Sequence, residues 1–233
     1  MRGDYYSDKL SAGRLKQAYD IAPPRVKQYL EAEVDHVAGY IMSGDRVLEL
    51  GCGYGRILPR LAEKASCVIG IDTSLTSLFM GRELLRDTPN CFLLRMDAIR
   101  LGFSDGVFDR VVCIQNGISA FHVSQRELIG ESIRVAKPAA TILFSSYSER
   151  FWEHRLEWFR LQSEAGLLGE IDHEKTGNGV IICKDGFKAT TVNPERFVSI
   201  VTGFNVDFQI IEVDESSIFC EITPEKKTAS STA

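Results

Sequence analysis

Three alternate glycines directly after an apolar run are the feature that most restricts how this chain can fold. They are Gly51, Gly53 and Gly55, and the run before them, Arg46–Leu50, has the pattern of a buried strand. Behind the glycines, apolar residues recur with helical spacing at Ile57, Leu58, Leu61, Ala62 and Ala65. Glycine lets a backbone turn tightly and approach a ligand where any Cβ would collide. This order predicts an α/β sheet with a ligand at its strand ends, although an ordinary tight turn is the alternative.

The alternation of strands and helices continues to about residue 146 and returns near the end of the chain. Further strands are predicted at Cys67–Ile71, Cys91–Met96, Phe108–Ile114, Ala140–Ser145, Phe204–Val213 and Ser217–Ile222. Helices are predicted to begin near Ser74, Ser124 and Asn193, and the third and fourth strands have only a short connection. The pattern predicts a doubly wound, mostly parallel seven-stranded sheet with helices on both faces and a closing antiparallel pair.

Two segments fall outside this alternation. Pro23 and Pro24 open a helix with an apolar stripe, and an earlier helix is expected over Lys9–Tyr19. After Ser146, an aromatic-rich helical stretch is followed by short strands around glycine turns. We expect N-terminal helices over the site (1–42), a core (43–146 and 193–224), a small α+β cap inserted after the fifth strand (147–192), and a flexible tail (225–233).

Composition argues against several classes of function. The net charge of −5 disfavours a broad nucleic-acid-binding face. No apolar stretch reaches the roughly 20 residues that cross a bilayer, and the first residues lack the apolar core of a secretory signal. The six cysteines form no C-x-x-C pair, and the four histidines have no metal-ligand spacing. We therefore expect a cytoplasmic protein with reduced thiols, no metal site and no membrane partner.

An acid after the second predicted strand favours a nucleoside ligand. Asp72 follows Gly51 by 72 − 51 = 21 residues, where nucleoside-binding α/β folds place the acid that holds the ribose hydroxyls. The alternative is that Asp72 only caps the helix after Ser74. A dinucleotide is disfavoured, because Arg56 stands in place of the third glycine of that fingerprint. Glu49 would repel a pyrophosphate but suits a ligand with an ammonium group.

Taken together, these motifs resemble those of class I S-adenosylmethionine-dependent methyltransferases, whose first motif is an acid followed by x-G-x-G-x-G. The resemblance covers residues 40–147 and 193–222. It includes Met96-Asp97-Ala98 after the third strand, Phe108-Asp109-Arg110-Val111-Val112 in the fourth, and Gly203-Phe204 before the closing strands. It implies S-adenosylmethionine as cofactor, S-adenosylhomocysteine as product, and direct methyl transfer to an O or N atom of a small-molecule acceptor.

The resemblance also implies roles for individual residues. The positions that match the family's cofactor site are Glu49, Gly51, Cys52, Gly53, Gly55, Asp72, Thr73, Asp97, Ala98 and Gln115. Among them, Glu49 would meet the methionine amino group or orient the loop, and Gln115 would hold the methionine portion. Two structural alternatives remain open: Asp97 as a turn or helix cap, and Asn116-Gly117 as a simple turn at the strand end.

The acceptor is less well defined. The N/D-P-P-Y motif and the Pro-Cys pair of two nucleic-acid-modifying subclasses are both absent after the fourth strand. Aromatic side chains in the two additions suit a planar or cationic acceptor, unless they only pack the cap. The acceptor-site candidates are Tyr5, Tyr6, Arg25, Asn116, Tyr147 and Trp152, and the candidates for a general base are His122, Tyr19 and Tyr6.

Two other functions stay open: methylation of RNA or protein, and cofactor binding without catalysis. The acceptor's identity, the catalytic residue, the pathway and the oligomeric state are not determined by the sequence.

Overall fold

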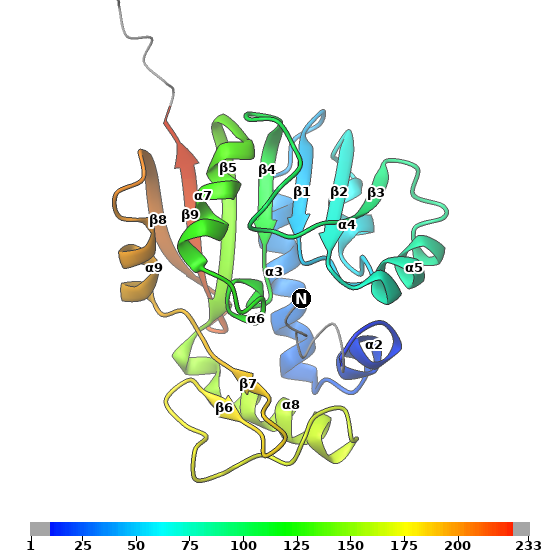
Figure 1. The fold of residues 1–233 in the computed structure, drawn as a ribbon, viewed down its shortest axis with the longest axis vertical. Helices are drawn as coiled ribbons and strands as arrows, with labels where there is room; N and C mark the ends of the chain where they lie inside the picture. Colours follow the sequence, from blue (N-terminus) through cyan, green and yellow to red (C-terminus); the bar gives the residue numbers. More distant parts are fainter. Residues whose placement is uncertain (1–9, 226–233) are drawn as a thin grey trace, which may run out of the picture.

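A seven-stranded sheet forms the centre of the computed structural model, which describes residues 10–225 (Figure 1). The strand order is β3-β2-β1-β4-β5-β9-β8. The first five strands run parallel, whereas β9 pairs antiparallel with both β5 and β8. The strands are β1 (Arg46–Leu50), β2 (Cys67–Asp72), β3 (Cys91–Arg95), β4 (Phe108–Cys113), β5 (Ala136–Tyr147), β8 (Val206–Val213) and β9 (Ser217–Pro224). The predicted doubly wound, mostly parallel sheet is confirmed.

Helices cover both faces of the sheet. One face packs against α3 (Pro24–Tyr40), α4 (Leu58–Ala62) and α5 (Leu75–Leu84). The other face packs against α7 (Gln125–Val135) and α9 (Pro194–Val201), and the short α6 (Gly117–Ala120) follows β4. Three of these helices begin where a side-chain oxygen accepts a hydrogen bond from a first-turn backbone N–H. The capping residues are Ser74, Ser124 and Asn193, as their sequence positions predict.

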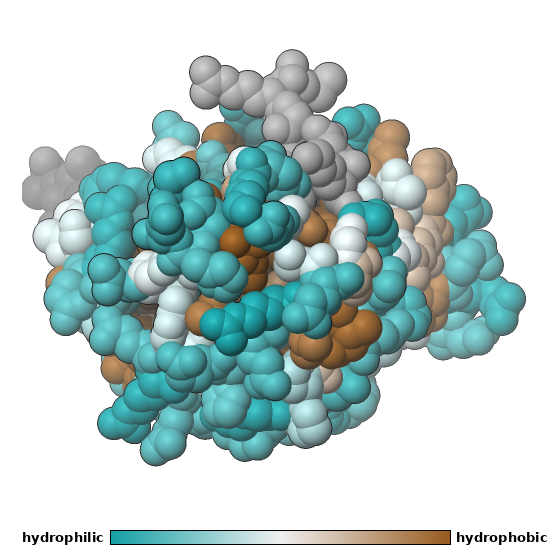
Figure 2. Space-filling model, turned by 90° about the horizontal axis from the view of Figure 1, so that it is seen from below, coloured by the Kyte–Doolittle hydropathy of each residue, from teal (hydrophilic) through white to brown (hydrophobic). Residues whose placement is uncertain are grey.

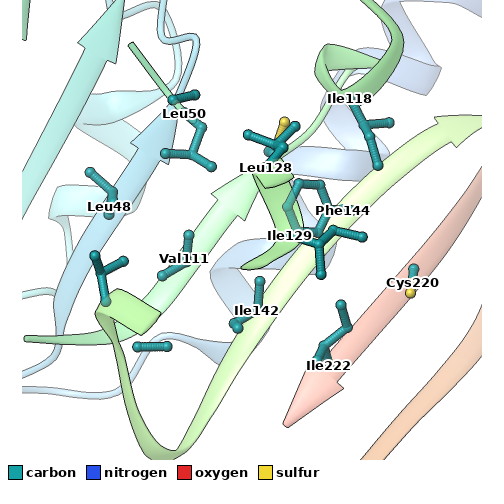
Figure 3. Packing of buried hydrophobic residues seen from close by; sticks show 14 of the residues in the cluster. Leu48, Leu50, Val111, Ile118, Leu128, Ile129, Ile142, Phe144, Cys220 and Ile222 are labelled. Carbon is teal, nitrogen blue, oxygen red and sulfur yellow. The ribbon is translucent and has the colours of Figure 1, made fainter. Parts of the chain in front are cut away.

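The second face forms the larger part of the core. Figure 3 shows Ile118 and Leu128 from the helical layer packed toward Val111 and Phe144 of the sheet. Val111, Leu128 and Phe144 are completely buried. Burying one such side chain contributes about 1.5–3 kcal/mol, so this layer holds the carboxyl ends of β1 and β4 in a fixed register.

The two additions pack against each other at the carboxyl ends of the parallel strands (Figure 1). A separate apolar cluster joins α2 and the start of α3 to the helix α8 and a two-stranded sheet. These elements are α2 (Gly13–Asp20), the 3-10 turn η1 (Glu149–Phe151), α8 (Trp152–Glu164), β6 (Ile181–Ile182) and β7 (Lys188–Ala189). The chain therefore has a second, smaller apolar cluster beside the main core.

One packing expectation was wrong. The apolar run of β3 predicts a strand buried on both faces, but Phe92 is 50% exposed and Leu94 is 38% exposed. β3 is an edge strand, and residues 96–107 of the described chain connect it to β4 without a helix that could cover these side chains. Within residues 10–225, no helix combines the length and the apolar character that crossing a membrane requires.

Candidate ligand-binding site

A cavity of about 880 Å³ lies at the carboxyl ends of the parallel strands. Its floor includes Gly51 after β1, Asp72 at the end of β2, and Gln115 after β4. Its walls include Tyr19 from α2 and Trp158 from α8. Since the carboxyl ends of neighbouring parallel strands meet at one edge, the sheet itself brings these segments together.

The glycine loop needs backbone conformations that other residues adopt only with strain. Gly51 has a φ of 75° and Gly53 a φ of 54°. A Cβ on Gly51 would lie 2.4 Å from the ring of Phe121, so a side chain there would collide with the cavity wall. Gly55 (φ 76°) does not line the cavity, and a Cβ there would meet Leu58 and Leu85 at 3.2 Å. Two of the three glycines therefore shape the cavity, and the third allows helix packing.

Asp72 has the structural role that its sequence position left open, whereas its role toward a ribose stays a prediction. Its Oδ1 accepts a hydrogen bond from Ser74 N at 2.7 Å at the start of α5. Its Oδ2 accepts one from Gly53 N at 2.9 Å and so fixes the glycine loop. Burial raises the pKa of this carboxyl above its ordinary value. Because a carboxylate has about four lone-pair sites, it keeps capacity for hydroxyl donors of a ligand in the cavity.

Three buried polar atoms that belong to cavity-lining residues have no hydrogen-bond partner among the described residues. They are Glu49 Oε2, Arg56 Nη2 and Gln115 Nε2. An unpartnered buried polar group costs about 1–3 kcal/mol, and more when it is charged. One acceptor and two donors match the ammonium and the carboxylate of an α-amino acid. The described residues therefore fit a ligand that has an amino-acid end.

In the ligand-free protein, nearby positive charge does not fully compensate the buried Glu49 carboxylate. Burial raises the pKa of Glu49 to about 8, against a smaller opposing effect of the Arg56 guanidinium. That guanidinium stacks 4.6 Å from the centre of the Tyr19 ring. A ligand ammonium beside Glu49 would stabilise the ionised carboxylate, because an opposite charge at short range favours the charged form.

The part of the cavity beside β2 and β3 contains three of the residues that the sequence assigned to a nucleoside. Asp97 and Ala98 follow β3, which neighbours β2 and its Asp72 in the sheet. Asp97 Oδ1 accepts from Ile99 N at 3.1 Å, so the predicted turn cap is present while the residue also lines the cavity. Thr73 lines the same region.

Another part of the cavity is lined by aromatic side chains. The Tyr19 and Trp158 rings lie 6.1 Å apart, and Trp158 Nε1 donates to Ala18 O at 2.8 Å. Tyr147, Phe159 and Gln162 complete this part of the lining. Burial raises the pKa of the Tyr147 phenol to about 12 and also raises that of Tyr19. Both phenols therefore stay protonated near neutral pH and can donate hydrogen bonds.

Asn116 lines the cavity, but its side chain is already paired. Its Oδ1 accepts from Ser146 Oγ at 2.8 Å, and its Nδ2 donates to Thr190 O at 3.0 Å. The amide therefore fixes the turn after β4 to β5 and to the segment that follows β7.

Three further candidates from the sequence lie outside the cavity lining. Arg25 forms an ion pair with Asp214 at 2.6 Å, and Trp152 lies beside the Arg155 guanidinium at 5.9 Å. His122 is exposed, with a φ of 52°. Tyr5 and Tyr6 lie outside the described residues, so the structure does not test them.

Sequence reasoning missed two polar residues of this region. Gln162 stands four residues after Trp158 on α8, and this spacing, which places both on one helix face, was the available signal. Arg56 was noticed only as a departure from a glycine pattern. Nothing in the local sequence shows that its guanidinium borders the same cavity as Glu49.

Comparisons with known proteins identify similar sequences and a common fold. Residues 47–139 match the family described as a methyltransferase domain. A demethylmenaquinone methyltransferase from Clavibacter sepedonicus is 32% identical over 107 residues, which are 46% of this chain and 43% of that protein. A ubiquinone biosynthesis O-methyltransferase from Methylococcus capsulatus is 28% identical over 137 residues, 58% of this chain and 54% of that protein.

A solved structure extends the similarity beyond the matched segment. A SAM-dependent methyltransferase from Methanosarcina mazei superposes with a TM-score of 0.60 at 21% identity, covering 82% of this chain and 97% of that one. At this identity the superposition demonstrates a common fold. The alignments with the two quinone-pathway relatives span only about half of those proteins' length.

Proposed function

We propose that the chain methylates a small-molecule acceptor, because residues 47–139 match the family described as a methyltransferase domain and the chain has the class I S-adenosylmethionine-dependent methyltransferase fold. The cofactor is S-adenosylmethionine, and the acceptor atom is oxygen or nitrogen. The observation that carries the proposal is one cavity whose lining joins three residues with unpartnered polar atoms to two strand-end acids and to several aromatic side chains. These residues are Glu49, Arg56, Gln115, Asp72, Asp97, Tyr19, Tyr147, Trp158 and Phe159.

The chain's own residues fit the parts of this cofactor. Glu49 would accept from the methionine ammonium, and Arg56 and Gln115 would donate to its carboxylate; all three carry an unpartnered polar atom. Asp72 would accept from the ribose hydroxyls and Asp97 from the adenine amino group, since both line the cavity. When bound, the cofactor supplies a methyl group on a sulfonium sulfur that is already an activated leaving group.

The protein must still orient the acceptor relative to the cofactor and exclude water from the cavity. Tyr19 and Trp158 cover the cavity from two elements that are distant in sequence. No histidine belongs to the described lining, and the lining phenols Tyr19 and Tyr147 have raised pKa values. We therefore assign no general base among the described residues.

Residues 1–42 and 147–192 form the proposed cover and substrate cap over the core of 43–146 and 193–224. Supporting this division, α2 and α8 pack together and contribute the aromatic walls. Figure 2 views the end of the molecule that carries α8 and the two-stranded sheet. Hydrophilic residues cover most of this face and hydrophobic ones form smaller areas, which favours an acceptor held inside the cavity.

Calorimetry with S-adenosylhomocysteine and with NAD tests the cofactor assignment. We expect binding of S-adenosylhomocysteine and none of NAD, and the reverse result would overturn the assignment. Incubation of labelled S-adenosylmethionine with a metabolite extract, with separate RNA and protein fractions, then tests the acceptor class. Label in the RNA or protein fraction alone would contradict a small-molecule acceptor, and absence of transfer to every fraction would favour binding without catalysis.

A further inference from the structure

The most deeply buried carboxylate of the N-terminal helices has no role in the site described so far. Glu33 lies on α3 and is 0% exposed, between the apolar residues Leu30 and Val34. A buried carboxylate is costly unless it is well hydrogen-bonded, so its partners indicate why the fold contains it.

Glu33 accepts hydrogen bonds from three strands or strand ends at once. Its Oε1 accepts from Ser217 Oγ of β9 at 2.6 Å. Its Oε2 accepts from Ser145 Oγ of β5 at 2.9 Å and from the backbone N–H of Gln115, directly after β4, at 2.6 Å. One side chain thus connects α3 to the part of the sheet where β4 ends at the cavity.

The backbone that Glu33 holds is strained. Gln115 has a φ of 56° and Asn116 a φ of 63°, two consecutive residues in the left-handed region. Asparagine adopts this region more readily than most residues, whereas for a residue such as Gln115 it costs about 1–3 kcal/mol and persists only where the surroundings fix it. The side chain of Asn116 is fixed by Ser146 and Thr190, and the N–H of Gln115 is fixed by Glu33.

Gln115 lines the cavity, and its side chain carries one donor without a hydrogen-bond partner among the described residues. Gln115 Oε1 accepts from Tyr19 OH at 3.4 Å, which leaves Nε2 as the unpartnered end of the amide. If the Gln115 backbone relaxed to an ordinary conformation, the direction of this amide would change. Glu33, which lies outside the cavity lining, is thus hydrogen-bonded to the backbone of Gln115, which belongs to that lining.

We propose that Glu33 is a positioning residue, which holds the strained turn at Gln115 so that the Gln115 amide meets the methionine carboxylate of the bound cofactor. The inference rests on the proposed function for the identity of that ligand. The hydrogen bond from Gln115 N to the Glu33 carboxylate is independent of it.

Protonation of Glu33 would weaken this arrangement. Burial raises its pKa to about 7, although hydrogen bonds from Ser217, Gln115 and Ser145 oppose the rise. The titratable groups that interact electrostatically with Glu33 are Arg56, Tyr19, Tyr29, Cys113 and Tyr147. Burial raises the pKa of the phenols and the thiol in this group, so only Arg56 among them is charged near neutral pH. The ionised carboxylate accepts all three donors, whereas the protonated form must give one oxygen to its own proton.

The test compares Glu33→Met with Glu221→Met. Glu221 is a matched control because it is 5% exposed, accepts from Tyr40 OH at 2.7 Å, and so also ties α3 to β9, away from the cavity. Two quantities are measured in each protein: amide exchange at Gln115 without ligand, and the dissociation constant of S-adenosylhomocysteine.

In Glu33→Met we expect Gln115 exchange at least tenfold faster and affinity at least tenfold weaker. Glu33→Gln, whose amide oxygen can still accept from Gln115, and Glu221→Met should stay within threefold of the unaltered protein. Equal effects of Glu33→Met and Glu221→Met on affinity, or unchanged Gln115 exchange in Glu33→Met, would overturn the inference. If the unaltered protein does not bind S-adenosylhomocysteine, the proposed cofactor is wrong, and the ligand-free exchange still decides whether Glu33 holds the turn.

A second measurement serves if Glu33→Met does not fold. In the unaltered protein, protection of the Gln115 amide, corrected for intrinsic exchange, should decrease as the pH falls through about 7. In Glu33→Gln this pH dependence should be absent. Equal pH dependence in both proteins would contradict the proposal.

Discussion

The two ends of the cavity are built in different ways. The proposed cofactor end consists of short segments at the ends of β1, β2, β3 and β4, and its shape at the glycine loop comes from backbone, as at Gly51 and Gly53. The aromatic end is assembled from side chains far apart in sequence, such as Tyr19 and Trp158. A loop fixed by its own sheet depends on few side chains, whereas a wall made by two packed helices depends on tertiary contacts.

Substitution in the glycine loop should have the largest effect on binding. In Gly51→Ala, the new Cβ meets the Phe121 ring at 2.4 Å and the residue keeps a φ of 75°. We expect S-adenosylhomocysteine affinity to fall about a hundredfold or more, which corresponds to at least about 2.7 kcal/mol. The control is Gly166→Ala, which has a similar φ of 69° and no neighbour within 4 Å. Calorimetry giving equal affinity for both variants would show that the close approach at Gly51 does not matter.

Loss of the ribose acid should have the next largest effect. Asp72→Ala removes acceptors for the ribose hydroxyls and for Gly53 N, and charge-assisted hydrogen bonds contribute about 1.5–3 kcal/mol each. We expect at least tenfold weaker S-adenosylhomocysteine binding. Asn193→Ala serves as a control, since it removes the cap of α9 far from the cavity lining. Unchanged affinity in Asp72→Ala would leave that residue with a structural role alone.

Glu49 should couple cofactor binding to proton release. Its pKa of about 8 without ligand means that it is mostly protonated at pH 7, and a ligand ammonium should lower that pKa. We expect the release of up to one proton at pH 7, seen as a dependence of the calorimetric enthalpy on the ionisation enthalpy of the buffer. In Glu49→Gln this dependence should disappear. Its persistence would assign the proton to another group.

The same residue sets a pH dependence of stability. Because the folded-state pKa of Glu49 is raised from its usual 4.5 to about 8, the folded protein binds more protons than the unfolded chain between these values. This group therefore makes the free energy of unfolding decrease as the pH rises from about 4.5 to about 8. Glu49→Gln should reduce that slope in denaturant titrations of the ligand-free protein.

The smallest effect is expected at the aromatic end. Trp158→Phe removes the hydrogen bond to Ala18 O but keeps an aromatic wall. We expect the KM for the acceptor identified by the labelling screen to rise a few-fold, with S-adenosylhomocysteine affinity within twofold. Trp152→Phe, outside the cavity lining, is the control. A larger loss of cofactor affinity than of acceptor affinity in Trp158→Phe would contradict the division of the cavity into two ends.

Local sequence predicted most of the fold and most residues of the proposed cofactor end. Apolar runs predicted all seven strands of the main sheet, and Ser74, Ser124 and Asn193 marked the helix starts. Strand and helix formation depend on periodicity and capping over a few residues, so the chain's own pattern suffices. Glycines and acids placed at strand ends converge because parallel strands share one edge.

Tertiary structure alone decided which polar side chains are left without partners. Arg25 was expected at the acceptor, but its partner Asp214 lies 189 residues away. Glu33 gave no signal in the sequence, because its partners come from β5, β9 and the end of β4. The free donor of Gln115 likewise follows from contacts with α2 and α3. Such pairings depend on how distant elements pack, which no local pattern of residues specifies.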